Sequence, residues 1–274
     1  MPTFTHFGQR LAYSEYGTGD RTVVLVHGLL LNQRMHEPLA RALAARGNRV
    51  ITLDLLGHGA SERPRDMWRY SMSFFGEQTI GLLDHLGVRE AVVLGTSLGA
   101  NTTLEAAVFA PERLRGIVIE MPVLDGALIA CGVAFLPLLL TMKYGRPVMK
   151  LVQKAARLVP RDTPPFLLDI VLDTLRQDPG PSGAVLEGLF FGRIAPHRFQ
   201  RRQIEVPALV IGHPRDPVHP FSDAGMLADE LPNGRLLEAS SILELRLAPE
   251  RLTSEIADFI DECWAVDQAS AAVA

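Results

Sequence analysis

Short runs of apolar residues alternate with segments of helical periodicity along most of the chain. The runs are rich in Val, Ile and Leu and show little polar/apolar alternation: Val23–Val26, Val50–Leu53, Ala91–Leu94, Ile117–Ile119, Ala208–Ile211 and Leu236–Leu237. Such runs are typical of parallel strands that are covered on both faces. The helical pattern predicts helices over 34–46, 72–87, 98–110, 222–231 and 249–263. Together they predict an α/β fold, with a mostly parallel central sheet and helices on both faces.

The alternation lapses between residues 122 and 203, where prolines are frequent. This stretch predicts short helices joined by turns, over 127–141, 147–158, 164–176 and 183–191. We therefore expect a core formed by residues 1–121 and 204–264, a helical insert over 122–203 and a flexible tail over 265–274. The segment Phe4–Tyr16 predicts an antiparallel pair of strands at the edge of the sheet.

Composition and charge exclude several classes of protein. The chain has 274 residues, of which 47% are hydrophobic and 21% charged, and a net charge of −4. This is ordinary globular composition without a basic field for nucleic acid. Two cysteines, Cys131 and Cys263, form no disulfide framework and no zinc-ligand pattern. We expect a cytoplasmic protein, because the N-terminus has no apolar signal.

The longest uncharged stretch, residues 126–142, falls just short of the length that spans a bilayer. It contains Pro137 and two glycines. We interpret it as a buried or pocket-lining segment and expect no stable membrane insertion.

Gly95-Thr96-Ser97-Leu98-Gly99 forms a G-x-S-x-G motif directly after a predicted strand and before a predicted helix. This context is typical of a nucleophile elbow. The sharp turn strains the serine backbone, and the flanking glycines leave room for neighbouring chain. Ser97 Oγ would then project near a helix N-terminus, where N–H groups favour developing negative charge.

A second turn follows the first long apolar run, which ends in His27-Gly28. Such a turn supplies the second donor of an oxyanion hole. The backbone N–H groups of Leu98 and Leu29 are the candidate donors. We interpret His27 as a brace for this loop.

In this combination and order the sequence resembles the α/β-hydrolase fold superfamily, especially its esterase, lactonase and haloperoxidase-like members with a helical cap. The resemblance rests on His27-Gly28, Asp54–Ser61, the Ser97 elbow and Ile211–Pro220. It implies that Asp54 and His58 belong to a scaffold loop. Epoxide hydrolases and haloalkane dehalogenases of this fold use an aspartate nucleophile, so a serine here favours acyl transfer.

The order of the family is serine, then acid, then histidine. Asp216 matches the acid position, and Asp125 is a fallback. The histidine is expected after the last strand, where this chain has Ser241 and Ile242. The sequence therefore lacks a base at the usual position. His219, three residues after Asp216, is the nearest candidate, although it is also interpretable as a loop brace; His36 is a weaker candidate.

Three interpretations follow from the displaced base. Another imidazole serves, or Ser97 works slowly or with assistance from the substrate, or the pocket binds without hydrolysis. The first prediction is a hydrolase that acts on an ester, thioester or lactone of a small hydrophobic molecule, without metal or organic cofactor. The alternatives are a ligand-binding pseudoenzyme and a lyase or isomerase that uses the oxyanion hole. The oligomeric state cannot be read from the chain.

Overall fold

The computed structural model describes residues 1–161 and 163–271, and the side chains of 146 and 266–271 lie outside that description. Its centre is an eight-stranded sheet of order β1-β2-β4-β3-β5-β6-β7-β8. β2 runs antiparallel to its neighbours, and β3 to β8 are parallel. The strands are β1 (Thr3–His6), β2 (Gln9–Tyr16), β3 (Arg21–Val26), β4 (Asn48–Asp54), β5 (Ala91–Thr96), β6 (Leu114–Glu120), β7 (Ala208–Gly212) and β8 (Gly234–Glu238).

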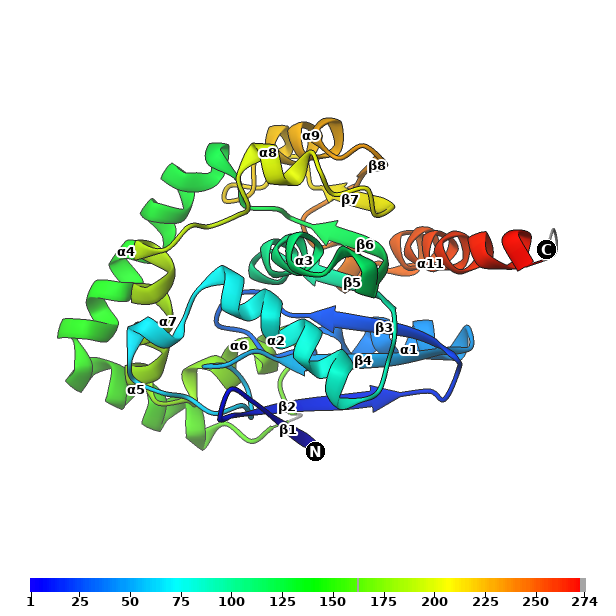
Figure 1. Ribbon diagram of the computed structural model, residues 1–274. Coiled ribbons are helices and arrows are strands. Elements are labelled where there is room, and N and C mark those ends of the chain that lie inside the picture. Colours follow the sequence, from blue (N-terminus) through cyan, green and yellow to red (C-terminus); the bar gives the residue numbers. More distant parts are fainter. Residues whose placement is uncertain (162, 272–274) are drawn as a thin grey trace.

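Helices cover both faces of this sheet (Figure 1). One buried apolar cluster joins alternate strand residues to α1 (Glu37–Ala45) and α11 (Glu250–Ala271). A larger cluster joins the other strand residues to α2 (Met72–His85), α3 (Leu98–Phe109) and α9 (Phe221–Glu230). Because the central strands are buried on both faces, they carry continuous apolar runs. The predicted α/β-hydrolase architecture is confirmed.

The predicted strands and helices are observed with shifts of a few residues at their ends, except that the helix predicted over 34–46 begins as the 3-10 turn η1 (Gln33–His36) before α1. Phe7 and Gly8, with φ angles of 45° and 75°, make the turn between β1 and β2. The short helices α8 (Arg198–Arg201) and α10 (Glu244–Leu247) lie outside the predicted set. The expected flexible tail is helical as far as Ala271, and residues 272–274 lie outside the described residues.

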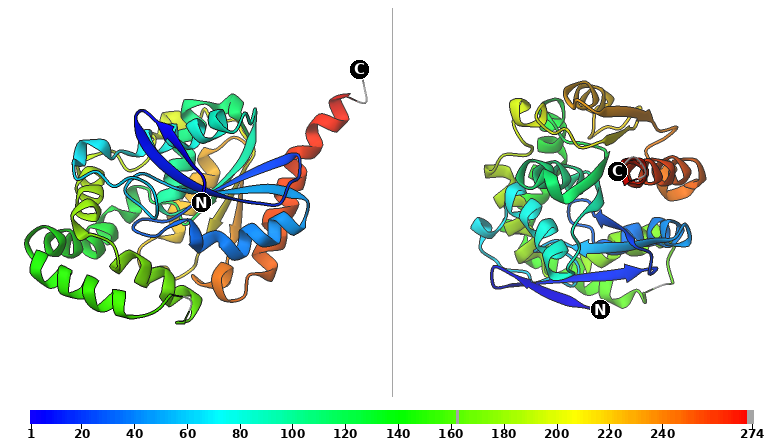
Figure 2. Two further views of the ribbon diagram at one scale, coloured as in Figure 1. Left: turned by 90° about the horizontal axis from the view of Figure 1, so that it is seen from below. Right: turned by 45° about the vertical axis from the view of Figure 1, so that its right-hand side comes forward.

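Between β6 and β7 the described chain forms helices that we call the cap. It lies on the opposite side of the molecule from the C-terminal end of α11 (Figures 1 and 2). Its longer helices are α4 (Leu128–Tyr144), α5 (Arg146–Leu158), α6 (Phe166–Leu175) and α7 (Pro179–Phe191), preceded by the 3-10 turn η4 (Asp125–Ala127).

Buried polar side chains of the core fix the two ends of the cap. Asn101 of α3 donates to the carbonyl of Val123 at 2.7 Å and to that of Ile194 at 2.8 Å, so one amide joins both connections. The Asp223 carboxylate of α9 accepts the N–H groups of Leu124 and Ala127 at 3.0 Å and so caps the start of α4. Sequence reasoning missed both residues.

A second attachment is ionic and joins the loop after β3 to α6. Arg34 donates to Asp173 at 2.6 Å and to Asp169 at 3.1 Å. Arg176 pairs with the same two buried carboxylates at 2.8 Å. These contacts attach α6 of the cap to the core.

By length and apolar composition, the segment Asp125–Tyr144 is a candidate for crossing a membrane. Only 17% of its most apolar window is buried in the structure. Its outer side is therefore open, whereas its inner side faces the site described next.

Candidate active site

The turn between β5 and α3 holds Ser97 in the backbone conformation expected of a nucleophile elbow. Its φ and ψ angles are 54° and −110°, which is strained for a residue with a Cβ. A Cβ at Gly95 would lie 1.9 Å from the Gly99 carbonyl oxygen, and one at Gly99 would lie 2.1 Å from that of Val26. The two glycines of the motif are thus required by close backbone approach.

His219 and Asp216, both in the loop between β7 and α9, complete a hydrogen-bonded series with Ser97. Ser97 Oγ lies 2.9 Å from His219 Nε2, and His219 Nδ1 lies 2.9 Å from Asp216 Oδ2. His219, which follows Asp216 in the same loop, therefore reaches Ser97. The loop-brace interpretation of His219 does not describe its ring, which bridges the two other groups.

Asp216 is held as a carboxylate by its own loop. Its second oxygen accepts the N–H groups of Val218 at 2.8 Å and His219 at 2.9 Å. Burial alone would raise the pKa of Asp216, but the hydrogen bonds from the His219 ring and from these two N–H groups outweigh it and lower the pKa. An ionised acceptor fixes the ring so that Nδ1 carries the proton and Nε2 can accept one.

The turn after β3 lies against the elbow. A Cβ on Gly28 would lie 3.9 Å from Ser97 Cβ, and Leu29, Ser97 and Leu98 line one cavity. Within the described residues, no group accepts a hydrogen bond from the backbone N–H of Leu29 or of Leu98. The two residues whose N–H groups were predicted as oxyanion donors therefore both line the cavity, and neither N–H has an acceptor among the described residues.

His27 and His36, the other histidines considered, contact backbone groups, as the loop-brace interpretation of His27 expects. The His27 ring accepts the Leu55 N–H at 3.1 Å, and burial lowers its pKa. His36 is fully buried against the Val26 carbonyl at 3.1 Å, and burial, aided by the charge of Arg246, lowers its pKa to about 3. Asp125 is exposed in η4.

The loop after β8, where a histidine is expected, carries Ser241 and Ile242. Among the residues that the structure describes, this loop and the helix after it hydrogen-bond to His213 and Glu120 and not to Ser97. The carbonyl of Ser241 accepts from His213 Nδ1 at 2.9 Å, and Ile242 is partly exposed. In the following helix, α10, Arg246 reaches the buried Glu120 carboxylate at 2.8 Å. Burial alone would raise the pKa of Glu120, but Arg246 and His213 outweigh it and lower the pKa.

Sequence reasoning did not single out Glu120, Arg246 or His213. Glu120 carried one signal, because it is a charged residue that directly follows the apolar run Ile117–Ile119 within a buried strand. Its partner could not be found from sequence, since Arg246 is one of many arginines and meets Glu120 only when β6 and α10 pack together.

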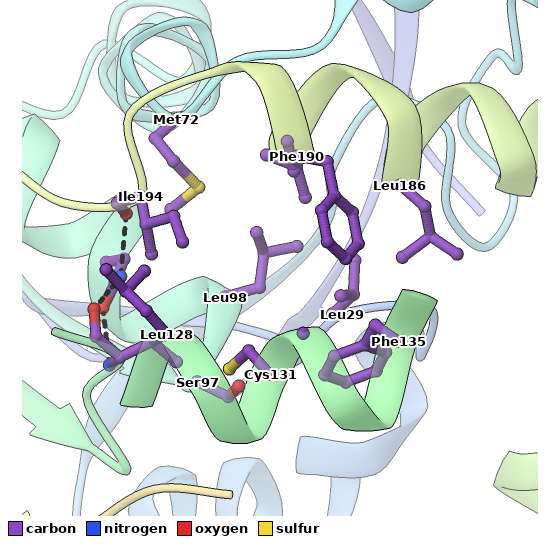
Figure 3. A pocket seen from close by; sticks show the side chains of 14 residues that line it. Leu29, Met72, Ser97, Leu98, Leu128, Cys131, Phe135, Leu186, Phe190 and Ile194 are labelled. Atoms are coloured by element: carbon purple, nitrogen blue, oxygen red, sulfur yellow. Dashed lines mark hydrogen bonds between the residues drawn. The ribbon is translucent and has the colours of Figure 1, made fainter. Parts of the chain in front are cut away.

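A cavity of about 220 Å³ opens beside Ser97, between the core and the inner side of the cap (Figure 3). Its walls are mostly apolar, with Leu29, Leu128, Phe135, Leu186 and Phe190 among them. The Asn101 amide in the wall is already engaged with Val123 and Ile194. No Lys or Arg occurs among the described residues that line this cavity.

Comparisons with known proteins agree with this architecture. A family model for the alpha/beta hydrolase fold matches residues 21–147. The enol-lactonase from Burkholderia xenovorans LB400 superposes with a TM-score of 0.76 at 23% identity, over 95% of this chain and all of that one. An esterase from Exiguobacterium antarcticum superposes with a TM-score of 0.74 at 18% identity, over 93% and 96% of the two chains.

A curated relative, the 2-hydroxymuconate semialdehyde hydrolase of Pseudomonas putida, is 41% identical over 76 residues. That match covers 28% of this chain and 27% of the relative, so it spans about a quarter of either protein. The superpositions show that the chain has the α/β-hydrolase fold, and the family model matches its residues 21–147.

Proposed function

We propose that the protein is a serine hydrolase that cleaves the ester or lactone bond of a small, uncharged hydrophobic substrate. The observation that carries this proposal is the hydrogen-bonded series from Ser97 Oγ through the His219 ring to the Asp216 carboxylate. A nucleophile within 2.9 Å of a base, itself oriented by a third group, is the arrangement that acyl transfer needs.

In the first half of the reaction, Ser97 Oγ attacks the substrate carbonyl while His219 Nε2 takes the hydroxyl proton. The N–H groups of Leu98 and Leu29 stabilise the oxyanion of the tetrahedral intermediate. His219 then gives its proton to the leaving oxygen, and an acyl-enzyme remains. Water, deprotonated by His219, releases the acid and restores Ser97.

The cavity supports the choice of substrate class. Its volume of about 220 Å³ is below the roughly 300–1,000 Å³ of common ligand pockets, which favours a small molecule. A substrate carboxylate would lose its hydration in these apolar walls without meeting a cation among the described lining residues. Neutral acyl chains or rings are therefore favoured. The relatives' names, an enol-lactonase and an esterase, agree with this bond type.

Labelling with an alkyl fluorophosphonate tests the proposal, because the probe reacts only with an activated serine. We expect stoichiometric labelling and hydrolysis of short p-nitrophenyl esters, both lost in Ser97→Ala. Ser241→Ala, an exposed serine in the loop after β8, is the matched control and should label like the unaltered protein. Absence of labelling together with binding of apolar ligands would instead identify a ligand-binding protein.

A further inference from the structure

The outer side of the α4–α5 pair is an apolar surface that no described part of the chain covers. In Figures 1 and 2 these two helices form the outer margin of the cap. The side chain of Ile129 is 83% exposed and that of Leu158 is 78% exposed. The same surface, which we call the cap face, consists of Ile129, Val133, Leu136, Leu140, Tyr144, Val148, Leu151 and Leu158.

The spacing of these residues shows that the exposure follows a helical stripe. On α4 the exposed apolar positions recur at intervals of three and four residues, as one side of a helix requires. The opposite side of α4 carries Leu128, Cys131 and Phe135 into the cavity beside Ser97. One helix therefore presents apolar side chains to the site on one side and to solvent on the other. Exposed apolar patches on soluble proteins commonly mark interaction sites.

Positive charge gathers beside this surface. All three lysines of the chain, Lys143, Lys150 and Lys154, lie in this hairpin. Residues 126–161 contain six Lys and Arg and no Asp or Glu, in a chain whose net charge is −4. Lys150, Lys154 and Arg157 fall within an arc of roughly 60° on α5, next to the exposed Val148, Leu151 and Leu158. Arg157 Nε donates to the carbonyl of Arg176 at 3.0 Å, so the two lysines are the cations that this edge leaves open. Lys150 and Lys154 have no ion pair among the described residues.

These observations distinguish between three possible surroundings of the cap face: a second copy of the chain, the interior of a membrane, and the surface of a membrane. A second copy packed face to face would bring the same cations against each other, which disfavours a symmetric dimer. A membrane span is disfavoured because the inner side of α4 walls the cavity beside Ser97, so that side of the helix is packed in the cap. An apolar stripe flanked by lysines and arginine is the pattern of a helix that lies in the interface of an anionic bilayer.

We propose that the cap face docks on an anionic phospholipid surface, with α4 and α5 lying in the plane of the interface. The apolar side chains enter the boundary between head groups and acyl chains, while Lys150 and Lys154 contact lipid phosphates. Docking in this orientation places the cavity close to the lipid, from which a hydrophobic substrate partitions. The docking itself does not depend on the proposed hydrolase activity.

Flotation of the full chain with vesicles tests the charge part of the proposal. We expect at least tenfold tighter partition into phosphatidylcholine vesicles containing about 30% phosphatidylglycerol than into phosphatidylcholine alone, with loss of binding at about 0.5 M salt. Lys150→Gln with Lys154→Gln should weaken partition about 30-fold, since each lysine near such a surface contributes about fivefold. The matched control, Arg46→Gln with Arg89→Gln, changes two cations next to the amino ends of β4 and β5 and should shift partition less than about twofold.

The apolar part is tested separately with Ile129→Ser, which we expect to weaken partition about tenfold. Phe109→Ser, at an exposed apolar residue that ends α3, is its control and should leave partition unchanged. Equal partition into both vesicle types, or an equal loss in the control variants, would overturn the proposal. So would a dimer in sedimentation velocity that Ile129→Ser dissociates. Because the readout is binding, a protein that floats but does not label with fluorophosphonate would contradict only the proposed hydrolase.

Discussion

The loops that follow β7 and β8 are neighbours at the edge of the site, and they differ in what their polar residues reach. The β7 loop turns tightly on the Asp216 carboxylate and directs the His219 ring to Ser97 Oγ. The β8 loop leads to Arg246, which neutralises the buried Glu120. The base and the acid of the proposed mechanism thus share one loop, while the loop that usually holds a histidine is structural. A missing residue at a family position is therefore weak grounds for inferring a missing group in space.

Removing the imidazole of the β7 loop should have the largest effect. We expect His219→Ala to lower kcat for a p-nitrophenyl ester by about 10⁶, because it removes the imidazole that is hydrogen-bonded to Ser97 Oγ. His197→Ala, an exposed histidine of the cap, should retain full turnover. Steady-state kinetics with fluorophosphonate labelling measures both. Turnover that survives in His219→Ala would assign the base to another group.

The acid of the same loop should have the next largest effect. In Asp216→Asn the amide can still accept the Val218 N–H, so the turn is kept. The amide NH₂ would, however, donate to His219 Nδ1 and place the ring proton on Nε2, where it cannot accept from Ser97. We expect kcat to fall by about 10⁴. Asp125→Asn, which changes the fallback acid, should have no effect; a loss there instead would transfer the role to Asp125.

The comparison of the loops also shows where sequence reasoning ends. The apolar runs predicted the strands of the central sheet, because burial on both faces imposes a pattern that is local in sequence. The elbow was predictable for the same reason. Gly95 and Gly99 are required by close backbone contacts within the turn itself and with the neighbouring strand β3. The Ser97–His219 contact joins residues 122 apart and depends on how the β7 loop folds back. The Glu120–Arg246 pair, 126 residues apart, is equally invisible without packing.

Breaking the ion pair under the β8 loop should affect stability. Arg246→Met removes the cation closest to Glu120 and leaves a buried carboxylate, which costs about 3–5 kcal/mol in the free energy of unfolding. Urea denaturation followed by circular dichroism measures the change. Adding Glu120→Gln to Arg246→Met should recover part of the loss, because the uncompensated charge is gone. An unchanged midpoint in Arg246→Met would show that Glu120 does not need this partner.

The difference in the free energy of unfolding between the unaltered protein and Arg246→Met should depend on pH. Because the folded pKa of Glu120 is lowered from the ordinary 4.5, its carboxylate contributes stability above pH 4.5 that is lost as the pH falls through the folded value. In Arg246→Met the carboxylate is no longer favoured and takes up a proton more readily. The difference in unfolding free energy between the unaltered protein and Arg246→Met should therefore become smaller below about pH 4.5 and be constant from pH 6 to 8. A gap that widens on acidification would contradict the assignment of charge to Glu120.

The smallest effect should come from restoring a histidine at the usual position. Ser241→His adds an imidazole to the β8 loop, but Ser97 Oγ is already bonded to His219 Nε2 and has no second proton to give. The backbone carbonyl of residue 241, which accepts from His213, is unchanged by the substitution. We expect kcat to change by less than about twofold, as for a surface substitution. In His219→Gln the same added histidine should not rescue turnover, because the carboxylate that would orient it belongs to the other loop. A rise of tenfold or more in either background would mean that the two loops are interchangeable and that the base of this site is not confined to the loop after β7.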